Sequence, residues 1–260
     1  MNNLWCVTVF FNPAHFKSLL QNYFTFSEEL SRQGVNLLTV ELAFGDDEFQ
    51  IPETDNVRRL RSNSVMWQKE RLINYGMSQT PDNCDAVAWC DCDVLFTRDD
   101  WAKLALVKLE NAHIIQLFKK VSFLPAGVQS CFGVTAPFQQ GVIWQHNIHK
   151  NWLLRRKAKE LHFSAPGFAW AARKEVYSDI GLYDKNIVGS GDTFLVDCYL
   201  NSWEIHGYAA KFNEKMKIDM ADWRAGLDAK KVYVDYLPID ILHLWHGTTK
   251  NRQYMQRHDI

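Results

Sequence analysis

The chain has 260 residues, of which 47% are hydrophobic and 23% charged, and its formal net charge is −1. This length and composition are typical of one large α/β domain or of two closely packed lobes. The near-neutral charge provides no overall attraction for nucleic acid or for an anionic membrane, so we expect neither as a partner.

The first part of the chain alternates between strand and helix patterns. Leu4–Phe11 is a continuous apolar run typical of a buried parallel strand. Asn12 and Pro13 supply a helix cap and a first helical residue, and the apolar spacing after them predicts a helix that ends at Gly34. Further strands are expected over residues 35–44, 57–60 and 86–89, and a helix over residues 65–77. This alternation predicts a mainly parallel central sheet flanked by helices.

The second part of the chain has a looser pattern. Helices are expected over residues 101–109, 152–161, 174–180 and 193–200, and strands over residues 114–118, 168–172 and 239–245. Residues 123–143 are expected to form a loop.

Cysteine usage and apolar run lengths indicate the cellular setting. The six cysteines include no Cys-x-x-Cys pair, which argues against a structural zinc site and favours reduced thiols. No signal peptide pattern opens the chain, and no apolar run reaches about 18 residues, the length of a membrane span. We therefore expect a cytoplasmic protein without a transmembrane segment.

Two aspartates, Asp91 and Asp93, follow the apolar strand at residues 86–89. On a regular strand they would point to the same side, and at its end they could present two carboxylates to one divalent cation. Such triplets also occur by chance in turns, but the buried strand before this one favours a metal site. Because ligands of parallel sheets bind at the carboxyl ends of strands, we expect Asn12, Glu41 and both aspartates to line one crevice.

The predicted helix before these aspartates carries basic side chains. Arg71 and Asn74 are three residues apart and share a helix face, from which a cation could reach phosphates. An ordinary amphipathic helix with Leu72 and Ile73 in the core explains the same residues equally well.

Asp192 is predicted at the N-terminus of a helix, after Gly189 and Gly191. The helix dipole would favour its ionised form, which could accept a proton as a general base. Helix capping is the simpler explanation of the same residue.

His243 and His246 lie near the end of the chain and could close on a metal that the aspartates hold. If both were on a strand they would face opposite sides, and only one would bind. His146 and His149 have the same spacing but no preceding strand end, so we assign them no function.

Taken in this order, the features resemble those of GT-A glycosyltransferases, which have the nucleotide-diphospho-sugar transferase fold. The likeness extends to family-2-like enzymes and to the animal beta-1,4-galactosyltransferases. Residues 67–76 resemble the donor-binding helix of the galactosyltransferases, with Lys69, Arg71, Asn74 and Gly76 in the matching places.

The resemblance implies a role for each candidate residue. Asp91-Cys92-Asp93 fills the metal-binding DxD motif, in which Asp93 binds the metal and Asp91 contacts the donor sugar or ribose. Asp192 matches the catalytic base, His246 matches a metal ligand, and His243 falls where a second, weaker ligand is found. The positions that resemble base- and ribose-binding residues are Asn12 and Glu41.

The chain also departs from the family pattern. Gly191 and Thr193 flank Asp192, where the family's acidic motif usually has Glu before the aspartate and often another acid after it. The segment at residues 123–164 matches no part of the family, so the resemblance says nothing about the acceptor.

The predicted function is transfer of a hexose or N-acetylhexosamine from a nucleotide sugar, a UDP-sugar by preference, to a hydroxyl of a glycan or other acceptor. The resemblance implies Mn²⁺ or Mg²⁺ as cofactor and inversion at the sugar. Residues 1–98 would form the donor-binding half and residues 99–260 the acceptor-binding and catalytic half of one domain.

Three other functions stay open. A nucleotidyltransferase acting on a sugar phosphate would also use paired aspartates and a metal, but residues 12–15 are not the glycine-rich basic loop that it would need. A non-catalytic nucleotide-sugar-binding module would explain Gly191. Sugar transfer to modified nucleic acid is disfavoured by the near-neutral charge.

Overall fold

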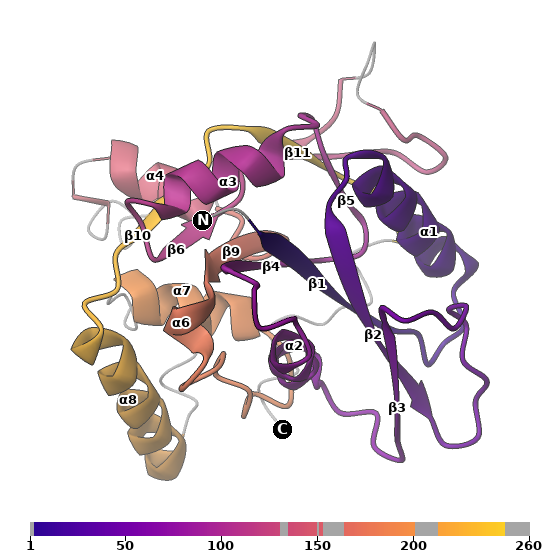
Figure 1. The fold of residues 1–260 in the computed structure, drawn as a ribbon, viewed down its shortest axis with the longest axis horizontal. Helices are drawn as coiled ribbons and strands as arrows, with labels where there is room; N and C mark the ends of the chain where they lie inside the picture. The colour runs from indigo at the N-terminus through magenta and orange to yellow at the C-terminus, as the bar shows by residue number, and fades with distance from the viewer. Residues whose placement is uncertain (1–2, 131–134, 150, 153–163, 201–212, 248–260) are drawn as a thin grey trace.

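A large sheet and a small sheet form the framework of the protein, with helices around them (Figure 1). The computed structural model describes residues 3–130, 135–149, 151–152, 164–200 and 213–247. The large sheet has seven strands in the order β10-β6-β9-β4-β1-β2-β3. Its strands are β1 (Leu4–Phe11), β2 (Asn36–Phe44), β3 (Val57–Ser62), β4 (Ala86–Cys90), β6 (Ile114–Gln116), β9 (Ala169–Arg173) and β10 (Val234–Tyr236).

The neighbouring strands β3, β2, β1 and β4 all run parallel, and β6 is parallel to β10. Within this sheet only β9 is reversed, since it pairs antiparallel with both β4 and β6. The predicted fold class, a mainly parallel α/β sheet flanked by helices, is therefore confirmed.

The small sheet has four strands in the order β5-β11-β7-β8. They are β5 (Val94–Phe96), β7 (Lys120–Phe123), β8 (Phe138–Gln140) and β11 (Asp240–His243). β5 follows β4 after a short turn, and β11 lies between β5 and β7. The small sheet thus brings the end of the described chain next to the residues that follow β4.

Helices cover both faces of the large sheet. They are α1 (Lys17–Arg32), α2 (Lys69–Ser78), α3 (Trp101–Leu109), α4 (Val142–Ile148), α6 (Lys174–Tyr177), α7 (Gly191–Leu200) and α8 (Glu214–Ala229). Phe26 of α1 and Trp101 of α3 are buried in one apolar core, whereas Ile73 of α2 and Phe194 of α7 are buried in a second one. Figure 1 shows α1 and α3 on the opposite side of β1 and β4 from α2.

Helix α2 packs very closely on the sheet. A Cβ atom added to Gly76 would lie 2.5 Å from Cγ1 of Val7 on β1, so only glycine allows this approach. This close packing holds α2 against the sheet. The first turn of the same helix carries Lys69 and Glu70.

Two helix starts differ from the prediction. Asn12 does not cap α1, which begins at Lys17; its Oδ1 accepts a hydrogen bond from Phe16 N at 2.9 Å in the preceding turn. Helix α2 begins at Lys69 rather than at residue 65, because the N–H of Trp67 donates to the carbonyl of Ile187 at 3.0 Å and ties this segment to another part of the chain.

The predictions for the second part of the chain were less complete. Residues 123–143 were expected to be a loop, but β8 and the start of α4 lie there. The strand expected up to residue 245 ends at His243, and the helix expected at residues 174–180 ends at Tyr177. Most of the helix expected at residues 152–161 lies outside the described residues.

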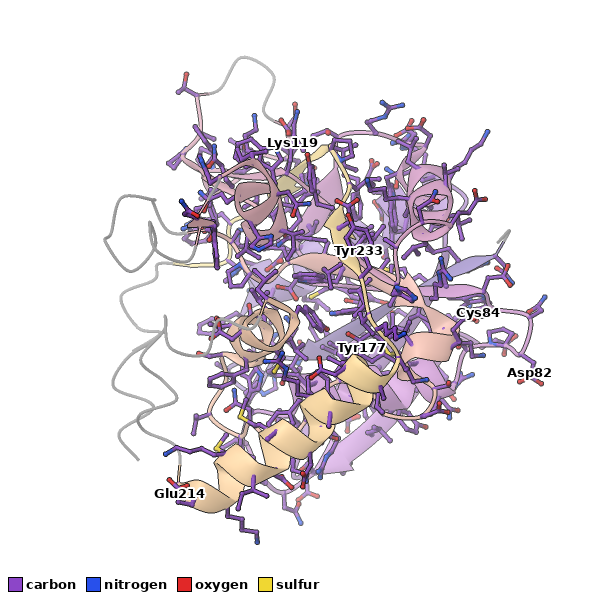
Figure 2. All side chains as sticks on the ribbon, turned by 90° about the vertical axis from the view of Figure 1, so that its left-hand side faces the viewer. Asp82, Cys84, Lys119, Tyr177, Glu214 and Tyr233 are labelled. Carbon is purple, nitrogen blue, oxygen red and sulfur yellow. The ribbon has the colours of Figure 1, made fainter. Side chains whose placement is uncertain are left out.

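Helix α8 and strand β10 were not predicted at all. Trp223 Nε1 of α8 donates to the carbonyl of Gly181 at 3.1 Å, and Met220 and Leu227 are buried. Figure 2 shows α8 running across the outside of the molecule, with Glu214 at one end. None of the helices in the described part of the chain is long and apolar enough to cross a membrane.

Candidate active site

Three potential metal ligands, Asp93, His243 and His246, converge beside the small sheet. Oδ2 of Asp93 lies 3.5 Å from Nε2 of His243 and 3.3 Å from Nε2 of His246. The three ligand atoms all lie within 4.8 Å of one another. We call these residues the metal triad, and all three come from the set predicted from the sequence.

Strand register explains why the triad forms. Asp93 directly precedes β5, whose first residue, Val94, pairs with His243 of β11. The N–H of Leu244 donates to the carbonyl of Asp93 at 2.8 Å, which continues the pairing. Because β11 ends at His243, strand alternation does not extend to His246, and the two imidazole rings lie 4.9 Å apart instead of on opposite faces.

The residues of the triad fit a divalent transition metal. Oδ1 of Asp93 is buried and has no hydrogen-bond partner among the described residues. A buried carboxylate oxygen without a partner is destabilising, and a bound cation would offset that cost. Two imidazoles and one carboxylate suit a first-row transition metal better than Mg²⁺, which prefers oxygen ligands.

Asp91 and Asp93 do not lie on one regular strand, on which they would point to the same side. Strand β4 ends at Cys90, and a turn at residues 92–93 separates the two side chains. Asp91 forms an ion pair with Lys69 of α2, whereas Asp93 faces the histidines. The turn therefore places the two aspartate side chains in different, neighbouring environments.

The environment around Asp91 is a small pocket, which we call the carboxylate pocket. Its charged lining residues are Lys69, Glu70, Asp91 and Asp192, and its aromatic ones are Trp89, Phe168 and Trp170. It thus combines hydrogen-bonding acids with apolar ring faces, the composition expected of a small-molecule site.

Lys69 places a fixed positive charge among these acids. Its side chain is only 19% exposed. Burial favours the neutral amine, but the carboxylates of Asp91 and Asp192 outweigh this effect and raise the pKa of Lys69 above its usual value. The ammonium group therefore stays protonated across the physiological range.

Asp192 lies at the predicted place, as the second residue of α7. Its Oδ1 accepts a hydrogen bond from Thr193 N at 2.8 Å. Across the pocket, a Cβ atom on Gly167 would lie 2.3 Å from Oδ2 of Asp192, so the loop before β9 passes directly against this carboxylate. Asp192 is thus held between the first turn of α7 and this loop.

Phe168 separates the carboxylate pocket from the metal triad. Its φ of 74° is unusual for a bulky residue and indicates local strain. The carbonyl of Phe168 accepts a hydrogen bond from Asp91 N at 2.8 Å, and its ring packs against His243 with centroids 5.2 Å apart. These contacts hold the pocket and the triad next to each other.

Glu70 is a pocket residue that the sequence reasoning missed. It is 4% exposed, and its Oε2 accepts a hydrogen bond from Trp67 Nε1 at 3.1 Å. Burial, partly opposed by the Lys69 charge, raises the pKa of Glu70 from 4.5 to about 7. Its spacing of three residues from Ile73, on the buried face of α2, is the signal that could have revealed it.

The raised pKa of Glu70 predicts a pH effect on stability. Between pH 4.5 and about 7 the folded protein keeps a proton that the unfolded chain has lost, so this residue makes folding less favourable as pH rises through that window. Between pH 4.5 and 8, Glu70 should lower the free energy of unfolding of wild type by an amount on the order of 3 kcal/mol, and Glu70→Gln should lack this decrease. Urea unfolding measures both proteins. The exposed Glu175→Gln variant is the control, and parallel pH profiles for Glu70→Gln and wild type would contradict the prediction.

Asn12 and Glu41 line a different pocket, together with Gln50. Glu41 lies inside β2 rather than at its end, because the pairing of β2 with β3 continues to Phe44. Its Oε1 accepts from Gln50 N and Ile51 N, and its buried Oε2 has no hydrogen-bond partner among the described residues. Asn12 Nδ2 donates to Gln50 Oε1 at 3.0 Å. The single crevice predicted from the strand ends is therefore divided into separate parts.

Arg71 and Asn74 face the segment that follows α6 and do not line the carboxylate pocket. The Arg71 side chain is 66% exposed, with Nε 3.4 Å from Asp184 Oδ2. Asn74 Nδ2 donates to Leu182 O at 2.8 Å, and its Oδ1 accepts from Leu182 N at 2.7 Å. In this structure both side chains hold the chain leading to α7.

Comparison with known proteins finds likeness in structure but not in sequence. No protein-family model matches the chain, and no curated protein matches it either. Solved structures similar to it include the Drosophila beta-1,4-galactosyltransferase 7 in a complex with manganese, UDP-Gal and xylobiose, with a TM-score of 0.43 and 13% identity over 90% of this chain. The chain spans 64% of that protein's length, which is less than two thirds.

Two further similar structures come from bacteria. Glucosyl-3-phosphoglycerate synthase from Mycobacterium tuberculosis, in complex with Mn²⁺, UDP-Glc and phosphoglyceric acid, has a TM-score of 0.45 and 13% identity, covering 99% of this chain and 76% of its own. The 4-diphosphocytidyl-2C-methyl-D-erythritol synthase from Anaerococcus prevotii has a TM-score of 0.40 and 11% identity, covering 98% of both chains. The function is argued from this chain's own residues.

Proposed function

We propose that this protein is a metal-dependent glycosyltransferase, which transfers a hexose or N-acetylhexosamine from a UDP-sugar to an acceptor hydroxyl with inversion. The main support is one juxtaposition. The metal triad lies directly beside a pocket that holds the Lys69–Asp91 ion pair and Asp192, at the carboxyl end of β4. That edge of a parallel sheet is where ligands of such folds bind.

The metal triad and the pocket of Asn12 and Glu41 suit the diphosphate and the nucleoside of a nucleotide sugar. A divalent cation such as Mn²⁺, held by Asp93, His243 and His246, would act as a Lewis acid that offsets the charge of a leaving diphosphate. Lys69 adds a fixed positive charge nearby. The separate pocket of Asn12 and Glu41 contains a buried carboxylate oxygen of Glu41 that has an ion pair with Arg59 but no hydrogen bond among the described residues, so it is suited to hydrogen-bond the nucleoside.

Asp192 is the residue we propose as general base. It lies in the first turn of α7, where the helix dipole favours the carboxylate form. From this position it could accept the proton of an acceptor hydroxyl as that oxygen attacks the sugar. A single displacement of this kind inverts the configuration at the anomeric carbon.

A donor panel tests the proposal without knowledge of the acceptor. The protein is incubated with Mn²⁺ and, separately, UDP-glucose, UDP-galactose, their N-acetyl forms and GDP-mannose, and nucleotide release by hydrolysis is measured. We expect release from one or more UDP-sugars, and none when EDTA is present.

Two other outcomes would replace the proposal with a rival function. Pyrophosphate release from UTP and a sugar 1-phosphate would identify a nucleotidyltransferase. Metal-dependent UDP binding without release from any donor, with or without a panel of glycan acceptors, would identify a non-catalytic nucleotide-sugar-binding module.

A further inference from the structure

Glu70 and Gly191 occupy a shared space at the wall of the carboxylate pocket. A Cβ atom added to Gly191 would lie 2.1 Å from Oε1 of Glu70 and 2.3 Å from its Cδ. No side chain at residue 191 is compatible with the present position of Glu70. The carboxyl group of Glu70 therefore fills the space of the side chain that Gly191 lacks, immediately before Asp192 in the chain.

The position of Glu70 is set by its own helix. Its Oε2 accepts the hydrogen bond from Trp67 Nε1, and the first turn of α2 is held by the close packing of Gly76 on β1. Glu70 is 4% exposed and is one of the residues that line the pocket. It is thus a buried acid directed at a ligand space.

The chemistry of the pocket indicates what it recognises. Carboxyl groups of Glu70, Asp91 and Asp192 can bind hydroxyls, while Trp89 and Trp170 supply broad apolar ring faces. A ligand with several hydroxyls around a partly apolar ring, that is, a pyranose, matches both features. Because Phe168 lines the pocket and also packs against His243 of the metal triad, a diphosphate at the triad would direct its attached sugar here.

We propose that Glu70 is a specificity-determining residue that hydrogen-bonds a hydroxyl of the transferred sugar, and that Gly191 provides the space for its carboxyl group. This role rests on the proposed glycosyl transfer. Helix α2 would then supply the acidic group that the resembled family usually has directly before the residue corresponding to Asp192. At neutral pH a carboxyl with the raised pKa of Glu70 can donate as well as accept a hydrogen bond, which suits a hydroxyl partner.

The test compares UDP with UDP-sugars, since only the sugar should contact Glu70. Calorimetry in Mn²⁺ measures binding of UDP, UDP-glucose, UDP-galactose and UDP-N-acetylglucosamine to wild type and variants. Wild type should bind at least one UDP-sugar more tightly than UDP. We expect Glu70→Ala to weaken binding of that UDP-sugar about 10-fold to 100-fold, the effect of losing a hydrogen bond to an acidic group, and to leave UDP binding unchanged.

A swap variant tests the shared space directly. Glu70→Ala combined with Gly191→Glu moves the carboxyl group from α2 to the first turn of α7, and we expect it to recover part of the lost UDP-sugar affinity. Gly191→Glu alone, which forces two carboxyl groups into one space, should bind the UDP-sugar more weakly than the swap variant. The exposed Glu175→Ala variant is the control, and Glu70→Met, which keeps the length of the side chain without its polar atoms, carries the test if Glu70→Ala does not fold.

Contrary outcomes are distinct. Equal UDP-sugar affinity in wild type and the Glu70 variants, or an equal loss for UDP and UDP-sugar, would overturn the role of Glu70 and leave the proposed function standing. The same conclusion would follow if wild type bound no UDP-sugar more tightly than UDP. A wild-type protein that binds neither UDP nor any UDP-sugar would overturn the proposed function and the role of Glu70 with it.

Discussion

Replacing Asp93 with asparagine is expected to lower Mn²⁺-dependent nucleotide release roughly 1000-fold, the effect of losing several kcal/mol of charge stabilisation. Asp93 is the only anion in the metal triad, and its Oδ2 lies within 3.5 Å of both histidine Nε2 atoms. Without that charge the two imidazoles alone would hold Mn²⁺ weakly. The measurement is UDP release from the preferred donor over a range of Mn²⁺ concentrations.

Stability measurements separate metal loss from misfolding. Because Asp93 Oδ1 is buried without a partner among the described residues, Asp93→Asn should be at least as stable as wild type in EDTA. It should lose the rise in melting temperature that Mn²⁺ gives the wild type. His243→Ala and His246→Ala should each reduce that rise, and Asp100→Asn, which alters an exposed acid near α3, should not. A full Mn²⁺ response in Asp93→Asn would rule out this triad as the metal site.

Replacing Asp192 with asparagine is expected to lower the kcat of sugar transfer about 100-fold to 10,000-fold, the usual contribution of a general base. The amide cannot take the acceptor proton. It can still accept the hydrogen bond from Thr193 N and fits against Gly167, so the pocket should keep its shape. The measurement is kcat and KM for transfer with the donor and acceptor identified by the panel.

Binding measurements distinguish catalysis from structure in this variant. Asp192→Asn should bind UDP in the presence of Mn²⁺ as the wild type does, since the metal triad and the pocket of Asn12 and Glu41 are untouched. Full turnover in Asp192→Asn would show that the base is another residue, and Asp91 would then be the next to replace.

Local sequence patterns were sufficient to predict the strands and the helix that carry the site residues. The apolar runs before Asn12 and before Asp91 form β1 and β4, and α7 begins at Gly191, directly before Asp192. These features could be predicted because a buried strand or a helix start depends mainly on residues close together in the sequence. A parallel sheet then brings strand ends to one edge, so the acids and histidines near those ends were reasonable candidates.

The tertiary structure decided how those candidates are grouped. Periodicity shows which face of an element is apolar, but the element that covers this face depends on packing between distant segments. The turn after β4 separates Asp91 from Asp93, and strand register brings Asp93 to His243. The contact of Glu70 with Gly191 joins two helices far apart in the chain. The sequence by itself therefore determined the mainly parallel α/β sheet and the candidate residues, whereas only packing and register decided which of them share a pocket and which can share a metal.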